Sequence, residues 1–472
     1  MDIGIYVALG LLAVYLLFVY WVIRTGKLEK WNLSLMLGVV LMVRTERGRG
    51  LLTAIARPRR FWNVVGDLGI VLTLGGMLVI TFFFLWSVWF VLQPGSGVPA
   101  LGASEILVIP GVNPFVPLWY GLAALAFTLV VHEAGHGVLA RANGMRVKSI
   151  GLLIAVVPVG AFVEPDDLDL KVASRRARLR VFGAGPAVNL GFAALALAAF
   201  ALLVGAATPT PGAHVAQLVQ DAPSMKAGLA VGDTIVLADA QPVRDWTAFQ
   251  GVLNRSTPGQ ELHLTLADGG VRTATLASYW AQLSSRDKDN VTAGTPAGMT
   301  TCRARLEPDP ATGDECATRL QAQAYIGIVP LLPQHTAFLS DPFVGGGRGL
   351  LNMMSLPVAE VRGNAPYLST YLPAFHDAPF EPALFWGLVS LAFWIFWINL
   401  MVGLTNILPM LPLDGGHIFR DAVGGVVQRL RPGLAAETRE RMVGRFATGM
   451  SLLILGAFLL QILGPHLVQS FV

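Results

Sequence analysis

The sequence predicts a polytopic α-helical membrane protein with six transmembrane helices and a polar α/β domain inserted among them. Apolar residues make up 54% of the 472 residues and charged residues only 14%, and the mean hydropathy is +0.59. Such values are typical of a chain that crosses the membrane several times. Six segments approach the ~20 apolar residues that a helix needs to cross the hydrocarbon core. They are residues 3–23, 68–92, 118–140, 183–205, 383–408 and 446–464.

The first of these segments begins at the N-terminus. MDIGIYVALGLLAVYLLFVYWVI has no basic region before its apolar run, and the run is too long for a signal peptide. We therefore expect a spanning helix and not a removable signal. The next apolar segment, WNLSLMLGVVLMV at 31–43, is too short to cross with certainty. It is compatible with an interfacial piece, a re-entrant piece or a buried hairpin.

The distribution of Lys and Arg predicts the orientation. Loops 24–67, 141–182 and 409–445 hold nine, eight and six basic residues, whereas loop 93–117 holds none. The basic loops alternate with the others, as six spans require, and the positive-inside rule places them in the cytoplasm. Both termini and the long stretch 206–382 are then extracytoplasmic. Basic stripes interleaved with aromatic residues are absent from the sequence, so we expect no nucleic-acid partner.

This pattern divides the chain into five regions. A first helix and its basic loop precede a membrane core, a polar domain, an interfacial linker and a second membrane core. Their residues are 1–67, 68–205, 206–330, 331–382 and 383–472.

The polar domain shows a recognisable order of elements. A strand-like run precedes a small-residue turn with a short helix (APSMKAGL), a β run (GDTIVLAD), a helical segment (WTAFQGVLN) and an alternating strand (ELHLTLAD). The order resembles a circularly permuted PDZ domain, most specifically in Ala227-Gly228-Leu229 followed by Val231-Gly232-Asp233. An unrelated α/β module is the alternative. Residues 284–320 resemble an insertion, and AYIGIVP at 324–330 resembles the closing strand.

The two cysteines, Cys302 and Cys316, have thirteen residues between them in the insertion. Neither belongs to a C-x-x-C motif, so a structural zinc site is not expected. A disulfide could persist if the stretch faces an oxidising compartment. The alternative is two unrelated thiols.

The third span ends in VVHEAGHGVLARANG, residues 130–144, which contains an H-E-x-x-H motif. His132 and His136 are four residues apart, so on a helix both face one side and can bind one zinc ion. Glu133 adjoins the first histidine and could take a proton from a metal-activated water. Three ionisable groups at the end of a spanning helix are costly unless they are functional. The alternative is two histidines that are satisfied by neighbouring helices.

A catalytic zinc ion needs a third protein ligand and an open position. The fifth span ends in NLMVGLTNILPMLPLDGGHIF, where Pro409 and Pro412 interrupt the helix. Prolines free backbone groups, which suits only a buried or wet site at membrane depth. Asp414 is the candidate third ligand, and His417 is its rival.

Four features in this order resemble the site-2 protease family of zinc intramembrane metalloproteases. They are HEAGH on an apolar helix, GAGPAVN at 183–189, the PDZ-like domain, and N-x-x-P-x-x-P-L-D-G-G-H at 406–417. The likeness covers residues from about 35 to 465. It implies zinc as the metal, Glu133 as the general base and a substrate backbone or scissile carbonyl held by asparagines. The implied zinc ligands are His132, His136 and Asp414, and the implied asparagines are Asn189 and Asn406. Asn189 could instead merely form a hydrogen bond between helices.

The resemblance implies that peptide bonds are hydrolysed within or near the cytoplasmic end of substrate transmembrane helices, in the cell membrane. The expected partners are membrane-spanning proteins and the bilayer. Loop 149–165, SIGLLIAVVPVGAFVEP, could dip back as a hairpin and offer an edge for strand addition; a buried strand with a packing role is the alternative. Two other functions stay open. One is a catalytically silent scaffold that binds peptides through the PDZ-like domain, and the other is a zinc enzyme that acts on a non-peptide.

Overall fold

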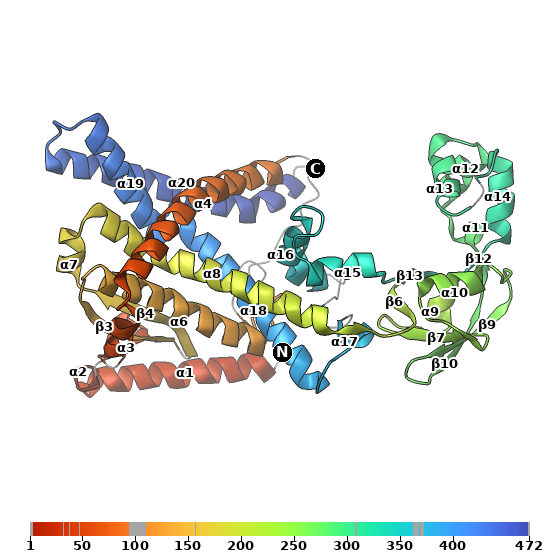
Figure 1. Ribbon diagram of the computed structural model, residues 1–472, viewed down its shortest axis with the longest axis horizontal. Coiled ribbons are helices and arrows are strands. Elements are labelled where there is room, and N and C mark those ends of the chain that lie inside the picture. The colour runs from red at the N-terminus through yellow and green to blue at the C-terminus, as the bar shows by residue number, and fades with distance from the viewer. Residues whose placement is uncertain are drawn as a thin grey trace. The chain divides into compact units, whose positions relative to one another are not determined.

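The computed structural model describes residues 3–31, 33–36, 38–46, 48–93, 110–155, 157–306, 309–361, 368 and 372–470. The chain forms two compact units (Figure 1). The first, here called the membrane unit, comprises Met1–Ala199 and Leu391–Val472, and the second, the polar unit, comprises Phe200–Ser390.

Long apolar helices build the membrane unit. Within the described residues, five helices are long and apolar enough to cross a membrane, and they agree with five of the six predicted spans. They are α4 (Arg59–Val91), α6 (Leu118–Ala142), α8 (Arg175–Ala206), α18 (Pro382–Ile407) and the Ala436–Pro465 part of α20 (Ala436–Ser470). The N-terminal segment forms α1 (Ile3–Arg24), within which Ala13–Arg24 is a shorter apolar helix. The sixth span therefore stays a prediction.

Shorter helices connect these elements. They are α2 (Lys27–Lys30), α3 (Arg49–Ile55), α7 (Asp167–Val172) and α19 (Asp414–Leu430).

Small residues bring α4 and α8 close together. A Cβ added to Gly69 would lie 3.1 Å from the Cβ of Ala187 and 3.3 Å from the carbonyl oxygen of Gly183. Where lipid replaces water, such small residues allow helices to pack through their backbones. The polar ends of the same helices are joined by Asp67, which accepts hydrogen bonds from Arg176 and Arg180, each at 2.7 Å.

A four-stranded antiparallel sheet lies in the membrane unit, in the order β1-β2-β3-β4. Its strands are β1 (Leu33–Met36), β2 (Val40–Thr45), β3 (Val147–Ala155) and β4 (Val157–Pro165). Of the alternatives for segment 31–43, the structure forms the hairpin. The hairpin expected in 149–165 is also confirmed, and β4 lies at the edge among the described strands.

Both ends of the β3–β4 hairpin are held by polar contacts. Near the turn, the Tyr15 hydroxyl of α1 lies 2.6 Å from the carbonyl oxygens of Ile154 and of Val39. At the other end, the Arg146 guanidinium donates to Asp169 at 2.9 Å and lowers the pKa of that carboxyl to about 2. The sheet is therefore fixed to helices at its two ends.

The polar unit contains a six-stranded antiparallel sheet in the order β10-β9-β7-β6-β13, with β8 paired to β7. The strands are β6 (Ala213–Leu218), β7 (Thr234–Ala238), β8 (Gln241–Pro242), β9 (Glu261–Leu266), β10 (Val271–Thr275) and β13 (Ile328–Pro330). Two short helices, α9 (Pro223–Lys226) and α10 (Trp246–Leu253), accompany the sheet. Phe249, Ile235, Leu262 and Leu264 lie fully buried in its core. This α/β arrangement is compatible with the PDZ-like domain, which stays a prediction.

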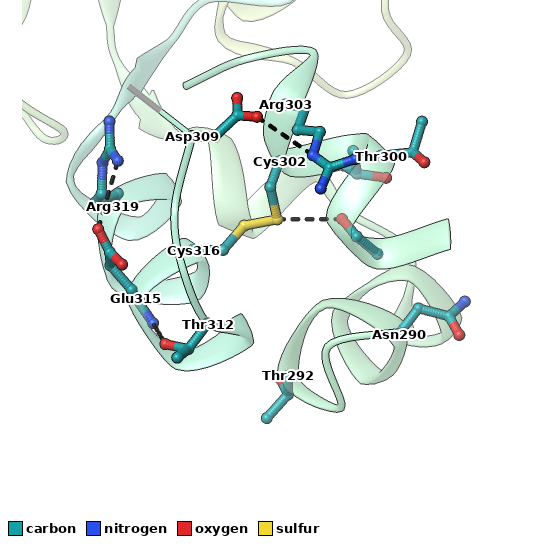
Figure 2. Close-up of a disulfide and its surroundings, with 12 residues drawn as sticks. Asn290, Thr292, Thr300, Cys302, Arg303, Asp309, Thr312, Glu315, Cys316 and Arg319 are labelled. Atoms are coloured by element: carbon teal, nitrogen blue, oxygen red, sulfur yellow. Dashed lines mark hydrogen bonds and ion pairs between the residues drawn. A yellow bond between two sulfur atoms is a disulfide. The ribbon is translucent and has the colours of Figure 1, made fainter. Parts of the chain in front are cut away.

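The predicted insertion is a small helical subdomain with its own core. It lies between β11 (Ala277–Ser278) and β12 (Ala324–Tyr325), which pair with each other. Its helices are α11 (Tyr279–Gln282), α12 (Ser285–Thr292), α13 (Pro296–Arg303) and α14 (Gly313–Ala322). Cys302 and Cys316 form a disulfide, with both cysteines fully buried (Figure 2). Of the two alternatives for these cysteines, the structure therefore has the disulfide.

The described residues of the polar unit also form further helices and one small strand pair. The helices are α15 (Pro333–Ser340), α16 (Arg348–Val361) and α17 (Leu372–Phe375), and β5 (Thr208–Pro209) pairs with β14 (His376–Asp377). The expected place of residues 331–382 along the outer membrane surface stays a prediction.

Candidate metal centre

Two helices bring three ligand-type side chains together in the membrane unit. His132 and His136 lie one turn apart on α6, and Asp414 is the first residue of α19. Their ligand atoms all lie within 4.8 Å of one another. Among the described residues, this is the one group of three His, Cys, Asp or Glu side chains placed to hold a metal ion. Both histidines are buried, with 7% and 9% of their surface exposed.

The spacing of these atoms suits a tetrahedral cation. The two Nε2 atoms lie 3.2 Å apart, and Asp414 Oδ2 lies 3.2 Å from His132 Nε2 and 3.3 Å from His136 Nε2. Ligands placed tetrahedrally at zinc distances of about 2.0–2.1 Å lie about 3.3 Å from one another. Asp414 Oδ2 is also buried without a hydrogen-bond partner in the described structure. A cation between the three side chains would satisfy it, so the residues fit zinc.

The outer nitrogen of each imidazole has a partner that orients the ring. His136 Nδ1 lies 2.7 Å from the carbonyl oxygen of Val181, so Nδ1–H donates and the Nε2 lone pair faces the group. The Asn189 amide lies 3.0 Å from His132 Nδ1. The contact atom is the amide nitrogen Nδ2, and an exchange of the amide oxygen and nitrogen would let Asn189 Oδ1 accept from Nδ1–H. Such partners fix the tautomer that a metal needs.

Gly185, which the sequence analysis did not single out, lies against both rings. A Cβ at this position would be 2.5 Å from His132 Cε1 and 2.5 Å from His136 Nε2. Any residue larger than glycine would clash with the histidine rings at this distance. The sequence contained a signal for this contact, the paired glycines of GAGPAVN within an apolar span, but the signal did not indicate which side chains approach.

Glu133 lies beside the ligand group and faces the sheet. Its Oε2 accepts a hydrogen bond of 2.9 Å from the backbone N–H of Val163 in β4. Gly137, one turn further along α6, allows this approach, since a Cβ there would lie 3.0 Å from Val163 Cγ1. A carboxylate next to His132 in the sequence is therefore bonded to the edge strand.

Two glycines set the position of Asp414. A Cβ on Gly415 would lie 2.2 Å from the carbonyl oxygen of Ile407, and one on Gly416 would lie 2.5 Å from the backbone nitrogen of Leu411. The start of α19 therefore folds directly onto the loop that follows α18. This close contact accounts for the glycines after the aspartate.

The remaining two candidates lie outside the group. His417 stacks on Phe182, with ring centroids 4.7 Å apart and an interplanar angle of 10°. The structure therefore brings Asp414, and not its rival, to the histidines. Asn406 is half-buried and donates to the carbonyl oxygen of Val402 in its own helix at 3.1 Å. Among the described residues, no hydrogen bond joins it to the ligand group.

Five helices of spanning length among the described residues indicate a multi-pass membrane protein. Two histidines and an aspartate placed to hold a metal ion, with a glutamate beside the first histidine, are typical of the metallohydrolase class. Residues 120–447, more than half of the chain, match the model of Peptidase family M50. The chain belongs to this family, as the resemblance to site-2 proteases indicated, and it is a zinc metalloprotease of the site-2 type.

Three relatives show how far the similarity extends. The protein MJ0971 of Methanocaldococcus jannaschii is 28% identical over 176 residues, which cover 36% of this chain and 46% of that protein. Metalloprotease MmpA of Caulobacter vibrioides is 25% identical over 65% of this chain and 86% of its own length. Zinc metalloprotease Rip1 of Mycobacterium bovis is 23% identical over 62% of this chain and 82% of its own length.

Proposed function

We propose that this protein cleaves peptide bonds within or near the cytoplasmic end of substrate transmembrane helices. The observation that carries the proposal is the place of Glu133, which follows His132 of a buried His–His–Asp group and accepts a hydrogen bond from the backbone of an edge strand. The basic loops that adjoin α6, α8 and α19 support a site near the cytoplasmic side, with the polar unit and both termini outside. The names of MmpA and Rip1 as metalloproteases agree with the chemistry.

Each residue of the site has a distinct role in this proposal. His132, His136 and Asp414 hold the zinc ion, which as a Lewis acid would lower the pKa of a water molecule at its open position and polarise the scissile carbonyl. Glu133 takes the proton of the attacking water and passes it to the leaving amine. Asn189 positions His132 by accepting from Nδ1–H.

In this proposal, the substrate backbone binds at the edge of β4. The Val163 N–H points away from β3 and toward Glu133, and Ala161, two residues along, presents its backbone to the same side. A substrate helix hides its peptide bonds in its own hydrogen bonds, so it must unwind before cleavage. An unwound segment in lipid then needs backbone partners, which strand addition to β4 provides.

Strand addition also frees the base. In the structure, Oε2 of Glu133 occupies the Val163 N–H. A substrate carbonyl that pairs with this N–H displaces the carboxylate, which is then available to the attacking water. Asn406 stays the candidate that holds the scissile carbonyl or the neighbouring substrate backbone.

The test combines metal content and cleavage of a transmembrane test substrate by detergent-purified protein. The wild type is compared with Glu133→Gln and with the control Glu437→Gln, which changes an exposed glutamate of α20. We expect one zinc ion per chain in all three, and cleavage by the wild type and the control alone. Equal cleavage by Glu133→Gln would refute the role of this base. Zinc without cleavage of any transmembrane substrate by any of the three would favour the scaffold, and cleavage confined to non-peptide substrates would favour the second alternative.

A further inference from the structure

A cavity in the polar unit brings together two histidines that the proposed proteolysis does not use. It has a volume of about 350 Å³ and lies between the end of α8, the strands β5 and β6, the helix α15 and the α17–β14 segment. His214 of β6 and His376 of β14 both line it. The other described lining residues are apolar except Thr336 and Ser340, and none of them is charged.

The two histidines belong to a contact between segments that lie far apart in the chain. β5 and β14 pair with each other, with His376 opposite Pro209. Beside this pair, the Thr210 N–H donates to the carbonyl oxygen of Phe375 at 2.9 Å. β5 follows α8 in the chain and β14 precedes α18. This contact, here called the clasp, therefore holds together the two segments that connect the polar unit to these spans.

The His214 ring is packed within the clasp. It stacks on the ring of Phe375, with centroids 4.3 Å apart and an interplanar angle of 29°. Its Nδ1 lies 3.0 Å from the hydroxyl oxygen of Thr234 in β7. Phe375 is only 1% exposed and packs in a small core with Ala216 and Leu331. One face of the imidazole is therefore covered by a buried apolar ring, where a charge is poorly solvated.

A positive charge on either histidine lacks a counterion at the cavity. No Asp or Glu is among the described lining residues, and two protonated imidazoles would repel each other. Burial, and then the neighbouring His376, lower the pKa of His214 to about 4. Burial also lowers the pKa of His376, although the Leu372 carbonyl and Asp377 act in the opposite direction. Both rings are therefore neutral at pH 7 while the clasp is closed.

The other ionisable groups of the surrounding elements do not change this balance. Arg244, before α10, and His335 of α15 are exposed and do not line the cavity. The carboxylate of Asp233, before β7, accepts from the Ala230 N–H at 2.8 Å. α17, β13 and the last turn of α8 contain no ionisable residue. A charge on His214 thus finds no carboxylate partner among them.

We propose that His214 and His376 make the clasp pH-sensitive, so that it is closed at neutral pH and opens on acidification. In the open form, both rings reach water and take up protons at their ordinary pKa of about 6.5. Protons therefore bind the open form more tightly than the closed form, and opening becomes more favourable as the pH falls below about 6.5. From pH 7 to pH 5, His214 alone should raise the opening equilibrium by about 20-fold. The device does not depend on the proposed proteolysis, since all its groups lie within the polar unit.

The test follows hydrogen–deuterium exchange of the full-length protein in detergent by mass spectrometry, at pH 7 and pH 5. Protection is corrected for the intrinsic exchange rate at each pH, so that it reports opening. In the wild type, segment 208–214, which contains the Thr210 N–H bonded to Phe375, should lose protection by about 20-fold or more. Strand β9 of the same unit should keep its protection, which separates opening of the clasp from unfolding of the unit.

Variants identify the groups that respond to pH. His214→Gln with His376→Gln should show equal protection of segment 208–214 at both pH values, because neither glutamine takes up a proton. His214→Gln alone should keep only the response of His376. The matched control is His263→Gln in β9, where an exposed histidine places Nδ1 3.0 Å from the hydroxyl oxygen of Thr273 on the neighbouring strand. It should keep the wild-type response.

Three results would overturn the proposal. The first is wild-type protection of segment 208–214 that does not change between pH 7 and pH 5. The second is an unchanged pH response in the double variant, which would assign the opening to other groups. The third is a parallel loss of protection in β9, which would show that the whole sheet unfolds and that the clasp does not open by itself.

Discussion

Gly185→Ala should remove the metal without unfolding the protein. The added Cβ would lie 2.5 Å from His132 Cε1, 2.5 Å from His136 Nε2 and 2.6 Å from His132 Nε2. Ordinary carbon contacts are about 3.5 Å or longer, so the rings would have to retreat by about 1 Å. A metal site tolerates ligand displacements of only about 0.2 Å. Loss of a partner that merely orients a ligand already costs about 10–100-fold in affinity, so we expect a loss of about 100-fold or more.

The assay is zinc stoichiometry and competition with a chelator of known affinity, on protein purified in detergent. The matched control is Gly183→Ala on the same helix, where the added Cβ would meet Gly69 at 3.4 Å and Thr73 at 3.5 Å, both ordinary contacts. Each substitution removes a helical glycine, which by itself favours the helix by about 1 kcal/mol. The difference between the variants therefore isolates the contact with the rings. Zinc bound by Gly185→Ala with wild-type affinity would refute the geometry of the site.

Three further predictions test separate parts of the structure. In a chelator competition, Asp414→Ala should lower the affinity for zinc by about 100-fold or more, while His417→Ala should leave it unchanged. The reverse result would make His417 the ligand. Tyr15→Phe removes the hydroxyl that contacts the turn end of the sheet. The KM for cleavage of a transmembrane substrate should rise while zinc stays bound. Unchanged kinetics would show that this contact does not position β4. Cys302→Ser with Cys316→Ser should destabilise the insertion by about 3 kcal/mol, the value for a loop of this length. Limited proteolysis would then cut the insertion faster than in the wild type, and equal rates would contradict the expectation.

The parts of the site that follow from local periodicity could be predicted from the sequence. Two histidines four residues apart share a helix face whatever the rest of the chain does, and α6 confirms that helix. The place of Asp414 at a break after an apolar helix was readable from the prolines and glycines around it. By contrast, the choice between Asp414 and His417 depends on which side of α19 faces α6, which only the packing of the helices decides.

The sheet could not be predicted from the sequence because its strands come from segments far apart in the chain. The short segment 31–43 left three alternatives open because nothing in its own residues names a partner. In the structure, Leu41 pairs with Ile154 and Thr45 with Ile150, across more than 100 residues of chain. A segment too short to span can be stable within a membrane when its backbone groups pair with those of another hairpin. The same pairing leaves β4 at the edge, so the order of the strands, and not the sequence of β4 alone, allows the proposed strand addition.

Close backbone approach connects the stability of the membrane unit with the geometry of its metal site. Lipid gives helices little hydrophobic reason to associate, so contact depends on small residues that allow short distances. Here Gly185 touches the ligand rings, and Gly415 seats the start of α19 against the carbonyl oxygen of Ile407. The glycines that let these elements meet therefore also set where the three ligand atoms converge. We therefore expect a larger residue at either position to shift a proposed zinc ligand directly, so that the metal ion is lost before the helices themselves are.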